Sequence, residues 1–170
     1  FPPHVAAAVK LLLALGVRKG ELLKATWDEF DLKAGIWRLP AERTKTEAAI
    51  RIPLAPWAVE VLTEQRARGY NGYIFPALRM SPGKTTGYMG DATMNQALYR
   101  LQSSLEPFTV HDLRRTARTH LAALGVVPHI AELCLNHKLK GIAAVYDVHD
   151  YFEERKAALA AWAALLAECE

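Results

Sequence analysis

Cysteine is scarce in this sequence and long apolar runs are missing, which narrows the classes of protein to which it can belong. Only Cys134 and Cys169 are present, far apart in 170 residues, so the sequence predicts no disulfide framework and favours a reducing, cytosolic setting. No stretch approaches the roughly 18 consecutive apolar residues of a membrane-spanning helix, and no signal peptide is visible. With 51% hydrophobic and 23% charged residues, the composition is that of a single folded domain. The chain begins at Phe1 rather than Met, and we expect it to be an excised domain or a processed product.

Positive charge exceeds negative charge only slightly, and the excess lies in the first part of the chain. The net charge is +3, while residues 150–170 carry five acidic and two basic side chains, a balance of −3. Residues 1–149 therefore carry +6, which is +3 minus −3. A basic body followed by an acidic tail suits a protein that binds nucleic acid, although many enzymes without such a partner have a similar distribution.

Apolar periodicity and the positions of Pro and Gly predict a mainly α domain with a small antiparallel β-sheet, an α+β fold. Short β-type runs are found at 35–40 and 48–54, and the run at 72–76 is a possible third strand. The polar segment 41–47 joins the first two runs into a predicted hairpin, and the Gly-rich segment 79–90 is predicted to be a surface loop. Helices are predicted at 2–16, 55–69, 91–105, 109–125, 127–137, 140–148 and 150–169, and segment 18–31 is predicted to be a short helix that runs into a loop.

Residues 109–125, TVHDLRRTARTHLAALG, combine one apolar face with several basic side chains. Thr109 and Asp112 have the spacing of a capping box at the start of a helix. The predicted buried stripe consists of Val110, Leu113, Ala117, Leu121 and Leu124. Arg114 lies only about 20° beyond the edge of this stripe, whereas Arg115 and Arg118 point away from it. Two interpretations of Arg114 stay open from this helix alone: its guanidinium pairs with a carboxylate, or it faces a phosphate.

Three motifs in a fixed order point to a known family. The segment LNHKLKGIAAVYDV places His137 nine residues before Tyr146, and it follows HDLRR at 111–115 and GVRKGELLKATW at 16–27. Together these motifs resemble the tyrosine recombinase family, the phage-type integrases that cut and rejoin DNA, and the resemblance covers nearly the whole chain. LNH departs from the commoner LGH. The resemblance implies the integrase catalytic-domain fold and a catalytic set of Arg18, Lys45, His111, Arg114, His137 and the nucleophile Tyr146.

The implied chemistry requires these residue types. Two arginines can bind the non-bridging oxygens of a phosphodiester through paired donors and remain charged at any working pH. Tyrosine, with a free pKa of about 10, needs the field of the arginines or a base such as His111 in order to attack. Lys45, between the two predicted strands of the hairpin, is the best match for the lysine that protonates the leaving 5′ oxygen. The implied product is a 3′-phosphotyrosyl bond, formed without any cofactor or metal.

Several of these residues also have plainer interpretations. Arg18 follows a helix end, where a cation complements the helix dipole, and His137 could simply close a helix. Cys134 and His137 have the spacing of half a zinc site, but no matching second pair accompanies them. Tyr151 competes with Tyr146 as a nucleophile, and the spacing from His137 favours Tyr146.

The resemblance also implies a setting. We expect residues 1–170 to be a single catalytic domain that lacks the N-terminal DNA-binding domains, with a C-terminal helix at about 151–168 that subunits can exchange. The expected partner is double-stranded DNA with attachment sites, bound by a tetramer, while the isolated domain is a monomer. The expected location is the bacterial cytoplasm, at the nucleoid and away from any membrane. The alternatives are a type IB topoisomerase and a non-catalytic helical DNA-binding module.

Overall fold

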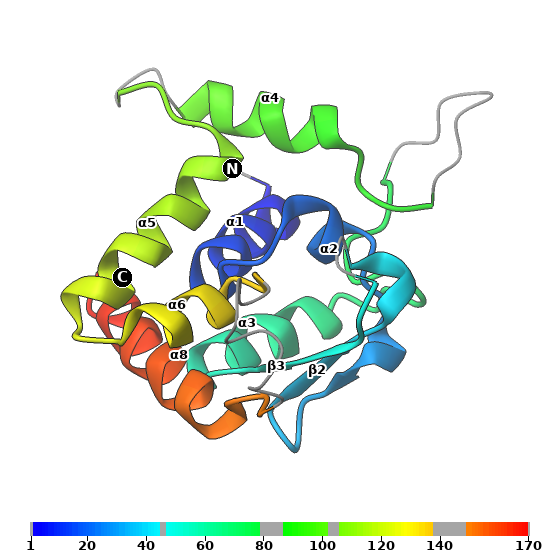
Figure 1. The fold of residues 1–170 in the computed structure, drawn as a ribbon. Helices are drawn as coiled ribbons and strands as arrows, with labels where there is room; N and C mark the ends of the chain where they lie inside the picture. Colours follow the sequence, from blue (N-terminus) through cyan, green and yellow to red (C-terminus); the bar gives the residue numbers. More distant parts are fainter. Residues whose placement is uncertain (1, 45–46, 79–86, 102–105, 138–148, 170) are drawn as a thin grey trace.

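The structure, a computed structural model, describes residues 2–44, 47–78, 87–101, 106–137 and 149–169 (Figure 1). The described strands are β1 (Phe30–Asp31), β2 (Ile36–Leu39) and β3 (Ile50–Pro53), with short 3-10 helices at Trp27–Glu29 and Ala41–Arg43. The described α-helices are α1 (Pro3–Leu15), α2 (Lys19–Leu23), α3 (Pro56–Arg66), α4 (Asp91–Leu101), α5 (Val110–Ala123), α6 (Pro128–Cys134) and α8 (Phe152–Ala167). The prediction of a mainly helical domain with a small antiparallel sheet is confirmed. The helix predicted at 140–148 lies outside the described residues.

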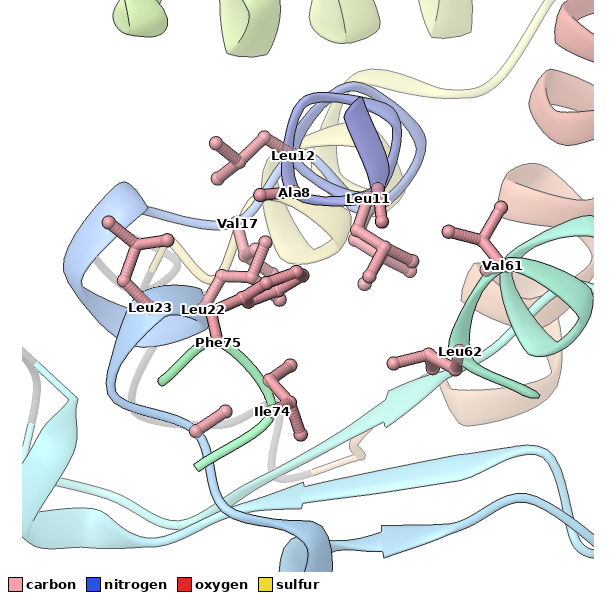
Figure 2. Close-up of a cluster of buried hydrophobic side chains, with 14 of the residues drawn as sticks. Ala8, Leu11, Leu12, Val17, Leu22, Leu23, Val61, Leu62, Ile74 and Phe75 are labelled. Carbon is pink, nitrogen blue, oxygen red and sulfur yellow. The ribbon is translucent and has the colours of Figure 1, made fainter. Parts of the chain in front are cut away.

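Helix α1 lies at the centre of the fold and packs against α3, α5 and α8 (Figure 1). It begins with Pro3 in its first turn and ends at Gly16, whose φ of 59° is the left-handed conformation that favours glycine. Leucines of α1 meet Leu22, Leu62 and Phe75 in the larger hydrophobic core (Figure 2). The centre of the fold is therefore apolar up to Gly16, and the polar residues of the site follow directly after it.

The sheet has the order β1-β2-β3, and both pairs of strands are antiparallel. In the hairpin predicted from the sequence, Trp37 pairs with Ile52. The prediction of a third strand at 72–76 is wrong, because that segment forms only isolated bridges and the third strand is β1. The successive side chains Ile74 and Phe75 are both fully buried. A sheet-edge strand would instead alternate between buried and exposed positions.

A second, smaller core joins α5, α6 and α8. Its buried members are Ala117, Leu121, Ile130, Ala131, Cys134, Ala158, Leu159 and Trp162. The indole N–H of Trp162 donates a hydrogen bond of 2.9 Å to the Leu13 carbonyl, so α8 folds back onto its own chain. Leu124, predicted to be buried, is 42% exposed, because α5 ends at Ala123 and Leu124 caps it. Among the described residues, no helix is long and apolar enough to cross a membrane.

Candidate active site

A basic hollow of about 480 Å³ opens where the chain leaves α1, beside the start of α5. It is lined by Val17, Arg18, Lys19, Asn95, Thr109, Val110, His111, Arg114 and His137. Four of the six residues predicted for the catalytic set thus meet here, although they are separated by up to 119 positions in the sequence, from 18 to 137. The other two, Lys45 and Tyr146, lie outside the described residues.

Arg18 is fixed by the turn between α1 and α2. It caps α2, and its backbone N–H donates to Glu21 Oε2 at 2.8 Å while its guanidinium donates to Glu21 Oε1 at 2.9 Å. Glu21 is only 3% exposed, so both carboxylate oxygens are committed to Arg18 within the fold. Glu21 therefore holds Arg18 in place, and the Arg18 side chain also lines the hollow.

Arg114 is buried, and its guanidinium is held by main-chain oxygens. It donates to the Gly16 carbonyl at 2.5 Å, to the Leu135 carbonyl, and to His137 Nε2 at 2.7 Å. Burial, aided by the nearby positive charge of Arg18, lowers the pKa of Arg114 to about 10, so it stays protonated at neutral pH. No carboxylate in the described part of the chain forms an ion pair with it. The geometry therefore does not favour the interpretation in which Arg114 pairs with a carboxylate.

His137 lies opposite Arg114, just beyond the end of α6. Its backbone N–H bonds to the Glu132 carbonyl at 3.0 Å, and its ring nitrogen Nδ1 lies 2.6 Å from Glu132 Oε2. The preceding residue, Asn136, has a φ of 53°. This left-handed conformation is most easily adopted by glycine and is tolerated by asparagine, which explains how LNH can replace LGH.

His111 stands at the first turn of α5, where the helix begins beside the hollow. Thr109 donates to Asp112 Oδ2 through its backbone N–H at 2.9 Å and through its hydroxyl at 2.7 Å, which confirms the predicted cap. Both hydrogen bonds lower the pKa of the Asp112 carboxyl, and the one from the Thr109 hydroxyl has the larger effect. The N-terminal end of α5 carries a partial positive charge, which adds to that of the basic side chains.

The residues that line the hollow suit an anion. Three of them carry a permanent positive charge, namely Arg18, Lys19 and Arg114, and His111 and His137 can add N–H donors. No acidic side chain is among its described lining residues. Such a set of converging donors can bind a phosphate and stabilise the charge that builds up on its oxygens during attack.

Two residues beside the hollow, Arg118 and Glu132, were not predicted to belong to the site. Arg118, predicted to point away from the buried stripe, donates from Nε to Glu132 Oε1 at 2.7 Å, and the other oxygen of Glu132 bonds to His137. Arg118 follows Arg114 by four residues, a spacing that places both on one side of α5, and this was the sequence signal that Arg118 lies near the site.

Cys134, which has the spacing of half a zinc site with His137, lies in a different environment. The second core buries the Cys134 thiol and raises its pKa to about 12, so it does not share the surroundings of His137.

Comparison with known proteins agrees with the motifs and the fold. The sequence model of the phage integrase family matches residues 2–153. The prophage integrase IntA of Escherichia coli K12 is 34% identical over 152 residues, which are 88% of this chain and 35% of that protein. The chain thus spans about a third of the length of such curated relatives.

Solved structures share the fold. The integrase of mycobacterium phage Brujita superimposes with a TM-score of 0.71 at 18% identity, over 94% of this chain and 52% of that one. The Tn1549 transposon integrase, solved in complex with a circular intermediate DNA, gives 0.65 at 19% identity, over 89% and 56%. The family match, the motif order and the convergence of four motif residues on one hollow together show that this chain belongs to the phage integrase family, the tyrosine recombinases.

Proposed function

We propose that this chain is the catalytic part of a site-specific DNA recombinase, which integrates or excises DNA by cutting and rejoining strands. The observation that carries the proposal is the pair of guanidinium groups of Arg18 and Arg114 on one basic hollow, each fixed by hydrogen bonds to its own chain. Preorganised donors of this kind stabilise a phosphorane-like transition state without the cost of rearranging in each turnover.

In the proposed reaction the phenolic oxygen of Tyr146 attacks the scissile phosphorus, and the bond from phosphorus to the 5′ oxygen breaks. His111 takes the phenolic proton, Lys45 supplies a proton to the departing 5′ oxygen, and a 3′-phosphotyrosyl bond forms. Arg18, Arg114 and His137 bind the non-bridging oxygens. Rejoining is the reverse reaction with a different 5′ hydroxyl, and the covalent bond conserves the energy of the one that was cut.

The proposed partner is double-stranded DNA that carries attachment sites, bound by four subunits that act on two duplexes. The basic hollow supports DNA as the ligand, and the DNA-bound Tn1549 integrase has the same fold. We also propose that the protein works in the bacterial cytoplasm, at the nucleoid, where such DNA is found.

Covalent trapping tests this function. The substrate is a pool of radiolabelled duplexes, each of which has a randomised sequence and one nick. Cleavage near the nick releases a short oligonucleotide, so the strand cannot be rejoined and the protein stays covalently attached to the DNA. We expect a labelled band of protein size in a denaturing gel. A non-catalytic DNA-binding module would give none. A type IB topoisomerase would also form the adduct, but it would relax supercoiled plasmids of any sequence and would not select one from the pool.

A further inference from the structure

Both ring nitrogens of His137 have hydrogen-bond partners within the chain. Nε2 lies 2.7 Å from the Arg114 guanidinium and Nδ1 lies 2.6 Å from Glu132 Oε2. An arginine can only donate hydrogen bonds, so Nε2 must present its lone pair to Arg114. A carboxylate can only accept, so the proton of the neutral ring sits on Nδ1, facing Glu132. The two partners therefore select one tautomer of His137.

Glu132 is itself held in place by α5. Its second oxygen, Oε1, accepts from Arg118 Nε at 2.7 Å, so each carboxylate oxygen has a strong donor. The hydrogen bonds from Arg118 and from His137 lower the pKa of Glu132, which keeps it negatively charged at neutral pH. Hydrogen bonds thus connect Arg118 on α5 to Glu132 on α6, and Glu132 to His137 at the basic hollow.

This arrangement has a consequence when an anion enters. A phosphate oxygen that binds to Arg114 and His137 together needs an N–H from Nε2, which presents its lone pair to Arg114 in the structure. Nε2 can provide that N–H only by taking a proton from solvent, while Nδ1 keeps its own. The ring then carries a positive charge, and the adjacent carboxylate of Glu132 balances it.

The other charged groups around His137 do not replace this carboxylate. Those that line a hollow together with His137 are Arg18, Lys19, His111, Arg114, Arg115 and Arg118, and, on its other side, Arg51, Asp150 and Arg155. The one acidic member of these sets besides Glu132 is Asp150, which is already paired with Arg51. Among the described residues that line these hollows, Glu132 is thus the acidic group that bonds to the ring.

We propose that Glu132 is a positioning residue for strand cleavage: it orients His137, fixes its tautomer, and supplies the countercharge when Nε2 takes up a proton on phosphate binding. The inference rests on the proposed function, in that the bound anion is a DNA phosphate. Arg118 supports Glu132 in this role, and neither residue contacts the DNA phosphate itself.

Three variants of the full chain test the proposal. Glu132→Ala removes both hydrogen bond and charge, Glu132→Gln keeps an acceptor but removes the charge, and Glu153→Gln is the control. Glu153 is 79% exposed on α8 and pairs only loosely, at 3.9 Å, with Lys156. For each variant we would measure the melting temperature, affinity for the nicked duplexes, and the single-turnover rate of adduct formation.

The first decisive measurement is the tautomer of His137 in DNA-free protein, from two-bond proton–nitrogen NMR spectra assigned with His137→Asn. We expect the Nδ1–H form in the wild type, in Glu132→Gln and in the control, and a mixture with Nε2–H in Glu132→Ala. Calorimetry in buffers of different ionisation enthalpy then counts protons taken up on DNA binding. We expect Glu132→Gln to take up fewer protons than the wild type.

Adduct formation should slow by about 10–100-fold in Glu132→Ala, by analogy with carboxylates that orient metal-bound histidines, with a smaller change in DNA affinity. An unchanged tautomer, or a rate within twofold of the wild type, would overturn the proposal. So would equal proton uptake in Glu132→Gln and the wild type. If the wild type itself forms no adduct, the proposed function fails, while the tautomer of the DNA-free chain still reports on Glu132.

Discussion

The Arg114 guanidinium is held in place by the carbonyl oxygens of Gly16 and Leu135. A lysine ammonium cannot reach both carbonyls and also present paired donors to a phosphate. We therefore expect Arg114→Lys, and likewise Arg18→Lys, to slow adduct formation by about 10²–10³-fold, as loss of a transition-state donor does. The affinity for DNA, measured by fluorescence anisotropy, should change much less.

Arg115 provides a matched control on the same helix, because its side chain is 74% exposed and pairs with Asp112 at 3.1 Å. Arg115→Ala should leave the cleavage rate nearly unchanged. Equal losses of affinity and rate in the two lysine variants would instead assign Arg18 and Arg114 to ordinary positioning of the DNA backbone.

Tyr146 and Tyr151 are distinguished by removing one hydroxyl at a time. Tyr151 caps α8 with a φ of 50°, and its ring packs against His129 and His149, which gives it a structural role. We expect Tyr146→Phe to abolish the adduct at an unchanged melting temperature, because only an oxygen is lost, and Tyr151→Phe to retain it. Adduct from Tyr146→Phe but none from Tyr151→Phe would reverse the assignment of the nucleophile.

The positions and contacts of the site residues could be predicted from the sequence only in part. Helical geometry alone placed Arg114 at the edge of a buried stripe, and the structure buries it. That Arg114 lies close to Arg18 and His137 could be predicted only from the family resemblance, because no local pattern links positions so far apart in the sequence. The Arg118–Glu132 contact could not be predicted, because an exposed charge on a helix has many possible partners until the helices are packed.

At the scale of elements, Gly16 joins the end of α1 to the site. Its φ is 59°, and a Cβ added there would lie 2.6 Å from Leu135 Cδ2. Its carbonyl also holds Arg114. We expect Gly16→Ala to lower the free energy of unfolding by about 1–3 kcal/mol through left-handed strain, with a further loss of cleavage rate as the carbonyl shifts. Denaturant titration and the trapping assay measure the two effects.

Gly20→Ala is the control for this substitution. Gly20 lies within α2, and a Cβ there would meet nothing within 4 Å. Alanine is the better helix former, so Gly20→Ala should be neutral or stabilising. If Gly16→Ala were equally harmless, the turn after α1 would not be what fixes Arg114.

Elements bounded by Pro and Gly were predicted well, as the starts of α1 and α3 and the end of α1 show. The third strand was misplaced, because a buried run such as Ile74 and Phe75 has the composition of a strand whether or not it pairs. The two-residue strand β1 carries too short a pattern to be recognised. Such errors concern which segments pair, and pairing depends on the packed molecule rather than on local sequence.

At the scale of the whole molecule, α8 completes the second core of its own chain through Leu159 and Trp162. We propose that the free chain is a monomer in this form and that subunits exchange α8 when four of them assemble on DNA. Exchange conserves these contacts, because each acceptor surface on α5 and α6 receives the same helix from a neighbour. It therefore requires that the acceptor surface can bind an α8 that belongs to another molecule.

Fragment complementation tests this requirement. A chain of residues 1–149 leaves Leu121, Ile130 and the rest of the second core uncovered, so we expect it to lose its cooperative thermal unfolding. Adding a peptide of residues 150–170 should restore both the melting transition and adduct formation, and a Trp162→Ala peptide should do so poorly because it lacks the indole that bonds to Leu13. If the truncated chain melts like the full chain, α8 is dispensable to the core. If no peptide concentration restores it, α8 packs only within its own chain, and exchange between subunits is ruled out.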